Sequence, residues 1–143
     1  MDASKPTAQV VRAGVERVCA EFDSRIAAHD FTRMSARLWS RRIGERLELI
    51  HFHRAGGSYG APARASVEIR VAFATRPADA RGPLILNGPS SDRLRSADGR
   101  AYHLRFNALT WSTFERCVDD LVRVALDHGL PWFAGQGGMA EDC

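Results

Sequence analysis

The stretch that decides the fold reads Val67-Glu68-Ile69-Arg70-Val71-Ala72-Phe73, with an apolar residue at every second position. Successive side chains of a β-strand point to opposite faces of a sheet, so this alternation predicts a strand over residues 65–75. One face of that strand is aliphatic and aromatic, whereas the other is mixed. We expect the apolar face to pack against helices, and its residues are Val67, Ile69, Val71 and Phe73.

A predicted hairpin precedes this strand. Residues 36–41 and 46–54 are strand-like, and Gly44 between them supplies the backbone angles that a tight turn needs. The orientation of the second segment stays open, because its pattern fits two arrangements. The outer face of the sheet carries either Ile50 and Phe52 or the set Leu47, Leu49, His51 and His53.

A second hairpin is predicted after the central strand. Residues 93–95 and 100–106 flank a turn that contains Asp98 and Gly99, a pair typical of two-residue hairpin turns. Between the two hairpins, proline- and glycine-rich connections surround a short apolar run at residues 84–86.

Amphipathic helices are predicted at both ends of the chain. Over residues 7–28, apolar side chains recur at steps of three and four and form one stripe. The last helix is expected to begin with Ser112 and Glu115 as a capping box, in which each side chain binds the other's backbone amide. Gly129 is the expected end of that helix, with Pro131 just beyond it.

The order of these elements predicts an α+β fold. Consecutive strands joined by hairpins give a mostly antiparallel sheet of about five strands. The N- and C-terminal helices then bury their apolar stripes on one face, which makes a two-layer sandwich. We expect a single α+β domain over residues 1–133, followed by a flexible, glycine-rich tail over residues 134–143.

Length and composition agree with one globular domain. The chain has 143 residues, of which 45% are hydrophobic and 26% are charged, so it can bury a core. No run approaches the roughly 18 apolar residues of a membrane span. The first residues lack the basic and apolar segments of a secretory signal, and we expect a cytoplasmic protein.

Charge and cysteine usage exclude some classes of function. The net charge is +3, and Lys5 is the single lysine among 20 basic residues, so nearly all positive charge is arginine. The arginines are interleaved with 17 acids rather than gathered on one face, which argues against nucleic-acid binding. Three cysteines without a close pair argue against disulfides and a zinc site, and they suit a reducing compartment.

His51 and His53 are the pair of residues that best suits a metal-binding or catalytic role. Two residues apart on a strand, they share a face and lie close enough to chelate one metal ion, with His103 or Glu68 as a third ligand. This pattern supports a metal-dependent or acid–base enzyme as the alternative function. Two histidines on a strand also suit a purely structural role, and no cofactor is expected.

Arg37, Trp39 and Arg41 form the second candidate site. Their alternation places them on one face of a strand, and arginine and tryptophan together are typical of interaction hot spots. With Glu68 they would form an association surface on the outer sheet face for a protein partner or for a second copy in a homodimer. The competing interpretation buries Trp39 in the core.

The chain resembles a bacterial family known as domain of unknown function four-three-zero-four. The resemblance rests on the first helix and on the segments Leu38-Trp39-Ser40-Arg41, Leu49-Ile50-His51-Phe52-His53 and Leu130-Pro131-Trp132-Phe133. Its layout covers most of residues 10–133, and it implies the same helix–strands–helix fold. The family brings no established activity, and members often have glutamine where this chain has His53. We therefore expect a non-catalytic binding or protein-interaction module.

Overall fold

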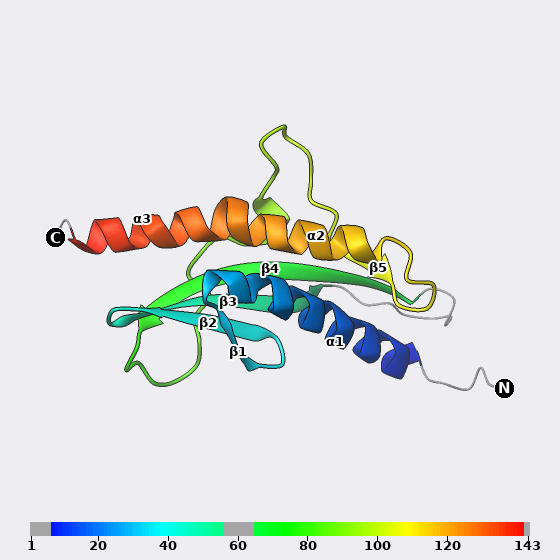
Figure 1. Cartoon of the computed structure of the whole chain (residues 1–143), viewed down its shortest axis with the longest axis horizontal. Helices are drawn as coiled ribbons and strands as arrows, with labels where there is room; N and C mark the ends of the chain where they lie inside the picture. Colours follow the sequence, from blue (N-terminus) through cyan, green and yellow to red (C-terminus); the bar gives the residue numbers. More distant parts are fainter. Residues whose placement is uncertain (1–6, 56–64, 142–143) are drawn as a thin grey trace.

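The computed structural model describes residues 7–55 and 65–141. Five strands lie between an N-terminal helix and a C-terminal helical segment, as Figure 1 shows. The elements are α1 (Thr7–Ile26), the short helix η1 (Ala27–His29), β1 (Thr32–Ser35), β2 (Leu38–Ile43), β3 (Arg46–Ala55), β4 (Ser66–Pro77), the short helix η3 (Ser91–Arg93), β5 (Arg105–Asn107), α2 (Phe114–Val124), η4 (Ala125–Gly129) and α3 (Leu130–Glu141). No helix in these two ranges is long and apolar enough to cross a membrane.

The sheet is a meander in the order β1-β2-β3-β4-β5, with every pair antiparallel. The predicted hairpin is present as β2 and β3, and Gly44 in its turn has a φ of 60°. The edge strand β1 was not predicted. Its four residues carry little apolar side chain, so no alternating pattern shows it in the sequence.

The strand register decides which face of the sheet is buried. Ile50 pairs with both Trp39 and Phe73, and Phe52 pairs with Val71, so these residues point to the same face. All five are nearly inaccessible to solvent. The predicted inward orientation of the apolar face of β4 is confirmed. The open choice for β3 is also decided: Ile50 and Phe52 lie inside, and His51 and His53 lie on the outer face.

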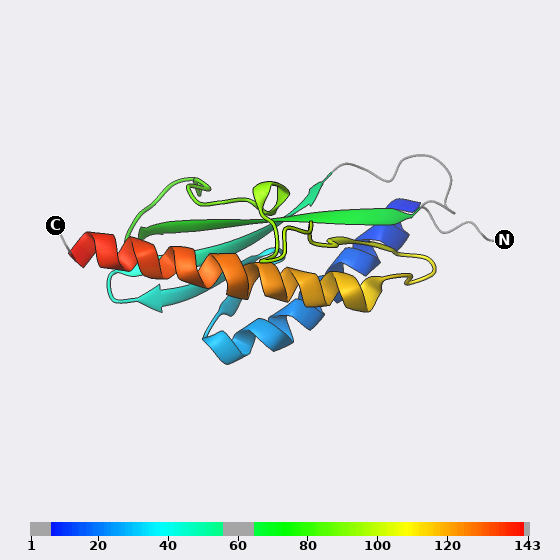
Figure 2. The ribbon, with the colours of Figure 1, turned by 90° about the horizontal axis from the view of Figure 1, so that it is seen from above.

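Both helical segments cover the inner face of the sheet (Figure 2). Side chains of α1 and α2 join those of β2, β3 and β4 in one hydrophobic core. At its centre Phe22 of α1 packs against Trp39 and Phe52, with ring centroids 4.9 and 4.6 Å apart. The predicted α+β architecture, with the N- and C-terminal helices on one face of an antiparallel sheet, is confirmed.

The C-terminal helix is longer than predicted. Instead of ending at Gly129, the chain passes through the π-helical turn η4 into α3 and forms one continuous rod (Figure 1). Pro131 has no N–H, and in an ideal α-helix its ring would collide with the carbonyl of Asp127. The wider π turn, closed by the Leu130 N–H on the carbonyl of Ala125, lets the helix continue past the proline. Residues 134–141, which were expected to belong to a flexible tail, are therefore part of helix α3.

The start of α2 also differs from the prediction. Thr113 precedes the helix with a φ of 62°, and no side chain caps the first turn. Its hydroxyl donates to the carbonyl of Arg105 instead. The predicted capping box of Ser112 and Glu115 is thus absent, because the tight turn from β5 already fixes how the chain enters the helix.

The free edge of β4 is completed by irregular chain rather than by a full strand. Ala72 forms an isolated bridge with Ser90, and the amide side chain of Asn87 bonds both backbone groups of Thr75. The apolar run at residues 84–86 forms no strand. The second predicted hairpin is reduced to one bridge between Arg95 and Ala101, and its later part becomes β5.

Candidate functional site

The structure does not form the predicted Arg37–Trp39–Arg41 surface. Trp39 is completely buried, and its indole Nε1 donates to the Asp23 carboxylate at 3.0 Å. Arg41 lies on the inner side of the sheet, where its guanidinium bonds the buried carboxylate of Glu48 at 2.6 Å. The competing interpretation of Trp39 as a core residue is correct. The row of Arg37, Trp39 and Arg41 therefore forms no association surface, and it no longer supports a homodimer.

The histidines of the predicted metal site are not brought together. His51 and His53 lie on the outer face of β3, opposite Ala72 and Arg70. His103 lies beyond β4, in a segment tied to α2 through its backbone N–H. Across residues 7–55 and 65–141, no three His, Cys, Asp or Glu side chains are grouped so that they could hold a metal ion.

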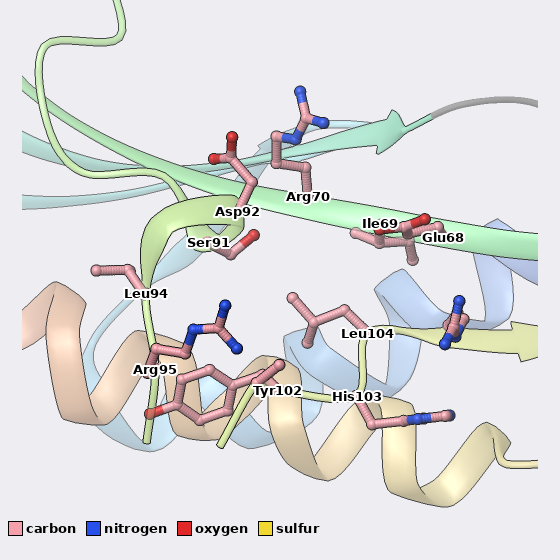
Figure 3. A pocket seen from close by; sticks show the side chains of 12 residues that line it. Glu68, Ile69, Arg70, Ser91, Asp92, Leu94, Arg95, Tyr102, His103 and Leu104 are labelled. Carbon is pink, nitrogen blue, oxygen red and sulfur yellow. The ribbon is translucent and has the colours of Figure 1, made fainter. Parts of the chain in front are cut away.

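Two other predicted residues, Glu68 and His103, line the same cavity at the edge of β4. This edge cavity has a volume of about 300 Å³ and lies between η3 and the segment that leads into β5 (Figure 3). Its floor is β4. It is lined by Glu68, Ile69, Arg70, Ser91, Asp92, Leu94, Arg95, Ala101, Tyr102, His103, Leu104 and Arg105.

The edge cavity exists because two side chains replace regular strand pairing. At one end of the cavity, the Ser91 hydroxyl accepts a hydrogen bond from the backbone N–H of Val71 at 2.9 Å, where a regular sheet would have the carbonyl of a neighbouring strand. At its other end the Asp120 carboxylate of α2 accepts the backbone N–H of His103 at 2.7 Å. The chain between these two anchors parts from β4 and leaves the hollow.

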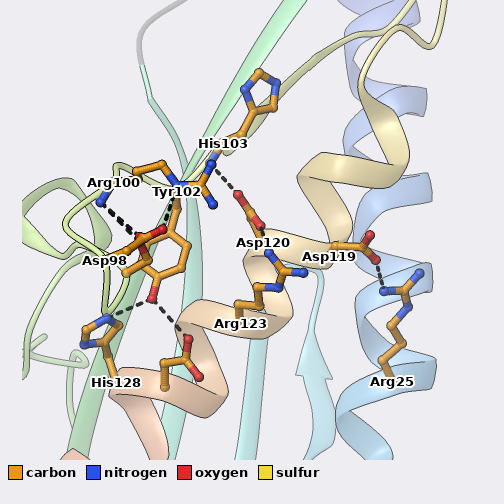
Figure 4. Close-up of polar contacts among 11 residues, drawn as sticks. Arg25, Asp98, Arg100, Tyr102, His103, Asp119, Asp120, Arg123 and His128 are labelled. Atoms are coloured by element: carbon orange, nitrogen blue, oxygen red, sulfur yellow. Dashed lines mark hydrogen bonds and ion pairs between the residues drawn. The ribbon is translucent and has the colours of Figure 1, made fainter.

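A polar network on the helical rod fixes the far wall of the cavity (Figure 4). The His128 Nε2 lies 2.9 Å from the Arg95 carbonyl oxygen and 3.0 Å from the Tyr102 hydroxyl. A carbonyl only accepts, so Nε2 carries the proton and donates to both oxygens. The Tyr102 O–H is then free to donate to the Asp127 carboxylate at 3.2 Å. The π turn that contains Asp127 and His128 thereby holds both flanks of the cavity.

The charges around the edge cavity do not cancel. Arg70 is close enough to Asp92 to lower the pKa of that carboxyl group, after the larger effect of the Ser90 hydrogen bond. Arg105 faces Glu68 as its cross-strand neighbour. Arg70 and Arg105 therefore each have an acidic residue nearby, although among the described residues neither guanidinium forms an ion pair.

Arg95 is the third lining arginine. Its guanidinium forms no hydrogen bond or ion pair with any residue in the described part of the chain, and it points into the cavity (Figure 3). It is accordingly a cation without a carboxylate partner at the mouth of a preformed hollow.

The His103 and Tyr102 side chains, which also line the cavity, are neutral near pH 7. Burial, with the charges of Arg116 and Arg105, lowers the pKa of His103, so its imidazole is uncharged. Burial and the nearby Asp127 carboxylate raise the pKa of Tyr102 to about 12. Neither group neutralises Arg95, and neither adds to its charge.

Sequence reasoning identified Glu68 and His103 but not the residues that shape the site. Ser91 and Asp120 act on backbone groups 20 and 17 residues away, and no local pattern reveals such a contact. One signal was present: a serine-rich break at Ser90-Ser91 before an arginine-rich segment, where short polar side chains often bond backbone.

Comparison of the chain with models of known protein families, with curated proteins and with solved structures finds no match. The resemblance to the family of unknown function therefore stays a prediction from the sequence.

Proposed function

We propose that this protein is a non-catalytic binding domain that holds the anionic group of a ligand in the edge cavity. The observation that carries the proposal is Arg95, which has no acidic partner among the described residues and points into a preformed hollow. A guanidinium is charged at every physiological pH, and its planar donors match the oxygens of a carboxylate or phosphate.

A second donor supports the same assignment. The Ser91 side chain is only 7% exposed, and its oxygen already accepts the Val71 N–H. Its own O–H is therefore free to donate, and Figure 3 shows the hydroxyl and the Arg95 guanidinium facing the same space. A charged and a neutral donor that converge on one point suit an oxyanion.

The rigid surroundings of the cavity favour binding over chemistry. Its walls are held by hydrogen bonds to β4 and to the helical rod, so little conformational entropy is lost when a ligand enters. The lining His103 imidazole is turned away from the centre in Figure 3, and the lining Tyr102 is engaged with Asp127. This arrangement offers no nucleophile beside a general base.

The proposal also includes a reducing compartment. Cys19 and Cys117 are both buried and unpaired, and burial raises the pKa of their thiols to about 11 and about 12. Such thiols serve as small apolar core residues, which suits the cytoplasm.

The test is a titration of the protein with acetate and with inorganic phosphate, followed by amide chemical shifts. We expect saturable shifts at Ser91, Arg95 and Leu104, and loss of saturation in Arg95→Gln. Arg93→Gln is the matched control, because Arg93 is an exposed arginine of η3 that does not line the cavity. Absence of saturation with both anions, or equal loss in both variants, contradicts the proposal.

A further inference from the structure

We infer that the ligand of the edge cavity is a small zwitterion of the amino-acid class, with a carboxylate and an ammonium group a few bonds apart. This inference rests on the proposed function, because it names the kind of compound whose anionic group enters the cavity. It is carried by three observations: unpaired charges of both signs around the hollow, a mostly polar lining, and a small volume.

Side chains of both charge signs line the edge cavity without neutralising one another. The arginines are Arg70, Arg95 and Arg105, and the carboxylates are Glu68 and Asp92. Among the described residues, none of these five charged groups forms an ion pair. A simple anion would be attracted by the arginines and repelled by the carboxylates, since opposite charges attract and like charges repel. A ligand that carries both charges meets an opposite charge at each of its ends.

Glu68 is the carboxylate that is available to a positive group. The other lining acid, Asp92, already accepts a hydrogen bond from the Ser90 side chain and lies close to Arg70, and both contacts lower the pKa of that carboxyl group. The Glu68 side chain is exposed, and its carboxylate accepts no hydrogen bond within the described part of the chain. In Figure 3, Glu68 and Arg95 lie on opposite sides of the cavity. The site therefore offers a negative charge at one side and a positive charge at the other.

The fold sets the separation between these two charges. The backbone carbonyl of Arg95 accepts a hydrogen bond from His128 Nε2 at 2.9 Å, which fixes the segment that carries the guanidinium. Glu68 lies on β4, where it is paired with Arg105 of β5. Because both backbone segments are held, the site should favour ligands with one particular distance between the ammonium and the carboxylate.

The lining suits a short polar compound. Ile69 and Leu104 belong to the core, with only 2% and 9% of their surface exposed, so they offer little apolar area to a ligand. The Ser91 oxygen accepts the Val71 N–H, which leaves the serine O–H to donate to a carboxylate. At about 300 Å³ the edge cavity lies at the lower limit of the roughly 300–1,000 Å³ that ligand cavities span. A single amino acid fits this space, whereas a long apolar chain does not.

The experiment measures the dissociation constants of glycine, β-alanine and 4-aminobutyrate on the full chain through amide chemical shifts. These three probes carry the same two charged groups at increasing separation. Acetate and the N-acetyl derivatives of the probes, which keep the carboxylate and lose the positive charge, are the comparison ligands. We expect one of the zwitterions to bind about tenfold more tightly than its N-acetyl derivative, because it adds a charge-assisted hydrogen bond to Glu68.

Two variants separate the two ends of the ligand. Glu68→Gln should remove the advantage of the zwitterion and leave acetate binding no weaker, because it deletes only the negative charge. Arg95→Gln should weaken the zwitterion and acetate by a similar factor, roughly tenfold, because both lose the contact of their carboxylate. Glu21→Gln is the matched control, since Glu21 is an exposed glutamate of α1 that does not line the cavity.

The outcomes distinguish this inference from the proposed function. Saturable acetate binding with no zwitterion favoured over its N-acetyl derivative overturns the inference and leaves the anion site intact. An advantage that persists in Glu68→Gln, or that disappears equally in Glu21→Gln, also overturns the inference. Absence of saturation by every probe, with acetate and inorganic phosphate included, overturns both.

Discussion

Glu48 is the most buried charged residue of the core face, with only 2% of its surface exposed. Its two carboxylate oxygens accept hydrogen bonds from Arg41 and Arg46, each at 2.6 Å. Arg41 also donates to the His29 carbonyl and lies over the Phe31 ring. One carboxylate thus ties β2, β3 and the end of the first helical segment together.

We predict that Glu48→Gln lowers the free energy of unfolding by roughly 3 kcal/mol, because it leaves two guanidinium groups near the core without a counter-charge. The lower end of the usual range applies, since the Arg41 and Arg46 side chains keep 20% and 23% of their surface exposed. Urea denaturation measures the change. Glu45→Gln is the control, because the Glu45 side chain is 94% exposed and its bond to Arg42 should contribute less than about 1 kcal/mol. Equal losses in the two variants would contradict the central role of Glu48.

His51 makes stability depend on pH. Its pKa is lowered first by burial and then by the charges of His53 and Arg37. The folded state therefore binds its proton less readily than the unfolded chain does. Stability from this group is fully present above the ordinary pKa of 6.5, and it is lost as pH falls below that value.

We predict that the protein unfolds more easily at pH 5.5 than at pH 7.5, and that His51→Gln reduces this difference. His53→Gln should also reduce it, because it removes the like charge that faces His51. The measurement is the urea midpoint at the two pH values. An unchanged pH dependence in His51→Gln would show that other groups, such as His103, carry it.

At the scale of elements, the π turn sets the position of the helical rod. Gly129 within this turn lies directly on Phe73 of β4: a Cβ atom at Gly129 would come 2.6 Å from the Phe73 ring. Four residues later, Phe133 packs edge-to-face on the same ring, with centroids 5.8 Å apart. The glycine allows the rod to approach the sheet so closely that both contacts form.

Gly129→Ala should therefore destabilise the protein by about 1–3 kcal/mol through overpacking, although alanine is the better helix former. Gly135→Ala is the matched control on the same rod, because nothing lies within 4 Å of its added Cβ. This second variant should gain about 0.5–1 kcal/mol. Thermal unfolding of both proteins tests the pair, and stabilisation by Gly129→Ala would refute the close contact.

The elements that could be predicted from the sequence are those with a local periodic signal. The alternation in β4 fixed its inward face, and the steps of three and four in α1 fixed its apolar stripe. The continuation of the helix past Gly129 and Pro131 was not predicted, because glycine and proline usually mark the end of a helix. The π turn that compensates for them depends on packing against Phe73. The candidate site was missed for a related reason, since Ser91 and Asp120 shape it through contacts between distant segments.

At the scale of the whole molecule, the three described helices α1, α2 and α3 leave the outer face of the sheet uncovered. Among its described residues, arginine dominates: Arg42 and Arg76 flank Leu47, Arg70 lies beside His53, and Arg105 faces Glu68, the one acid. The apolar centre of this face is narrow, because Leu49 and its neighbour Ala74 are almost fully buried. Two copies that paired through it would bring like charges together.

We accordingly predict that the protein is a monomer at physiological salt, in contrast to the homodimer expected when Trp39 was placed outside. Light scattering over a range of concentrations tests this. A dimer that persists at every concentration and dissociates in Arg70→Glu would show that the outer face does self-associate despite its charge.

The labelling rates of the two buried thiols can report how often the structure around them opens. Alkylating reagents attack the thiolate form of cysteine. In the folded protein the raised pKa keeps the Cys19 and Cys117 thiols protonated, whereas in the unfolded chain they ionise near the ordinary pKa of 9.0. Each labelling event therefore records one opening of the structure around that cysteine. Cys19 lies on α1 and Cys117 on α2, and both belong to one core. We expect peptide mapping to show both being labelled at one common rate, as a single cooperative opening requires. Two separate rates would reveal that one helix leaves the sheet while the other stays.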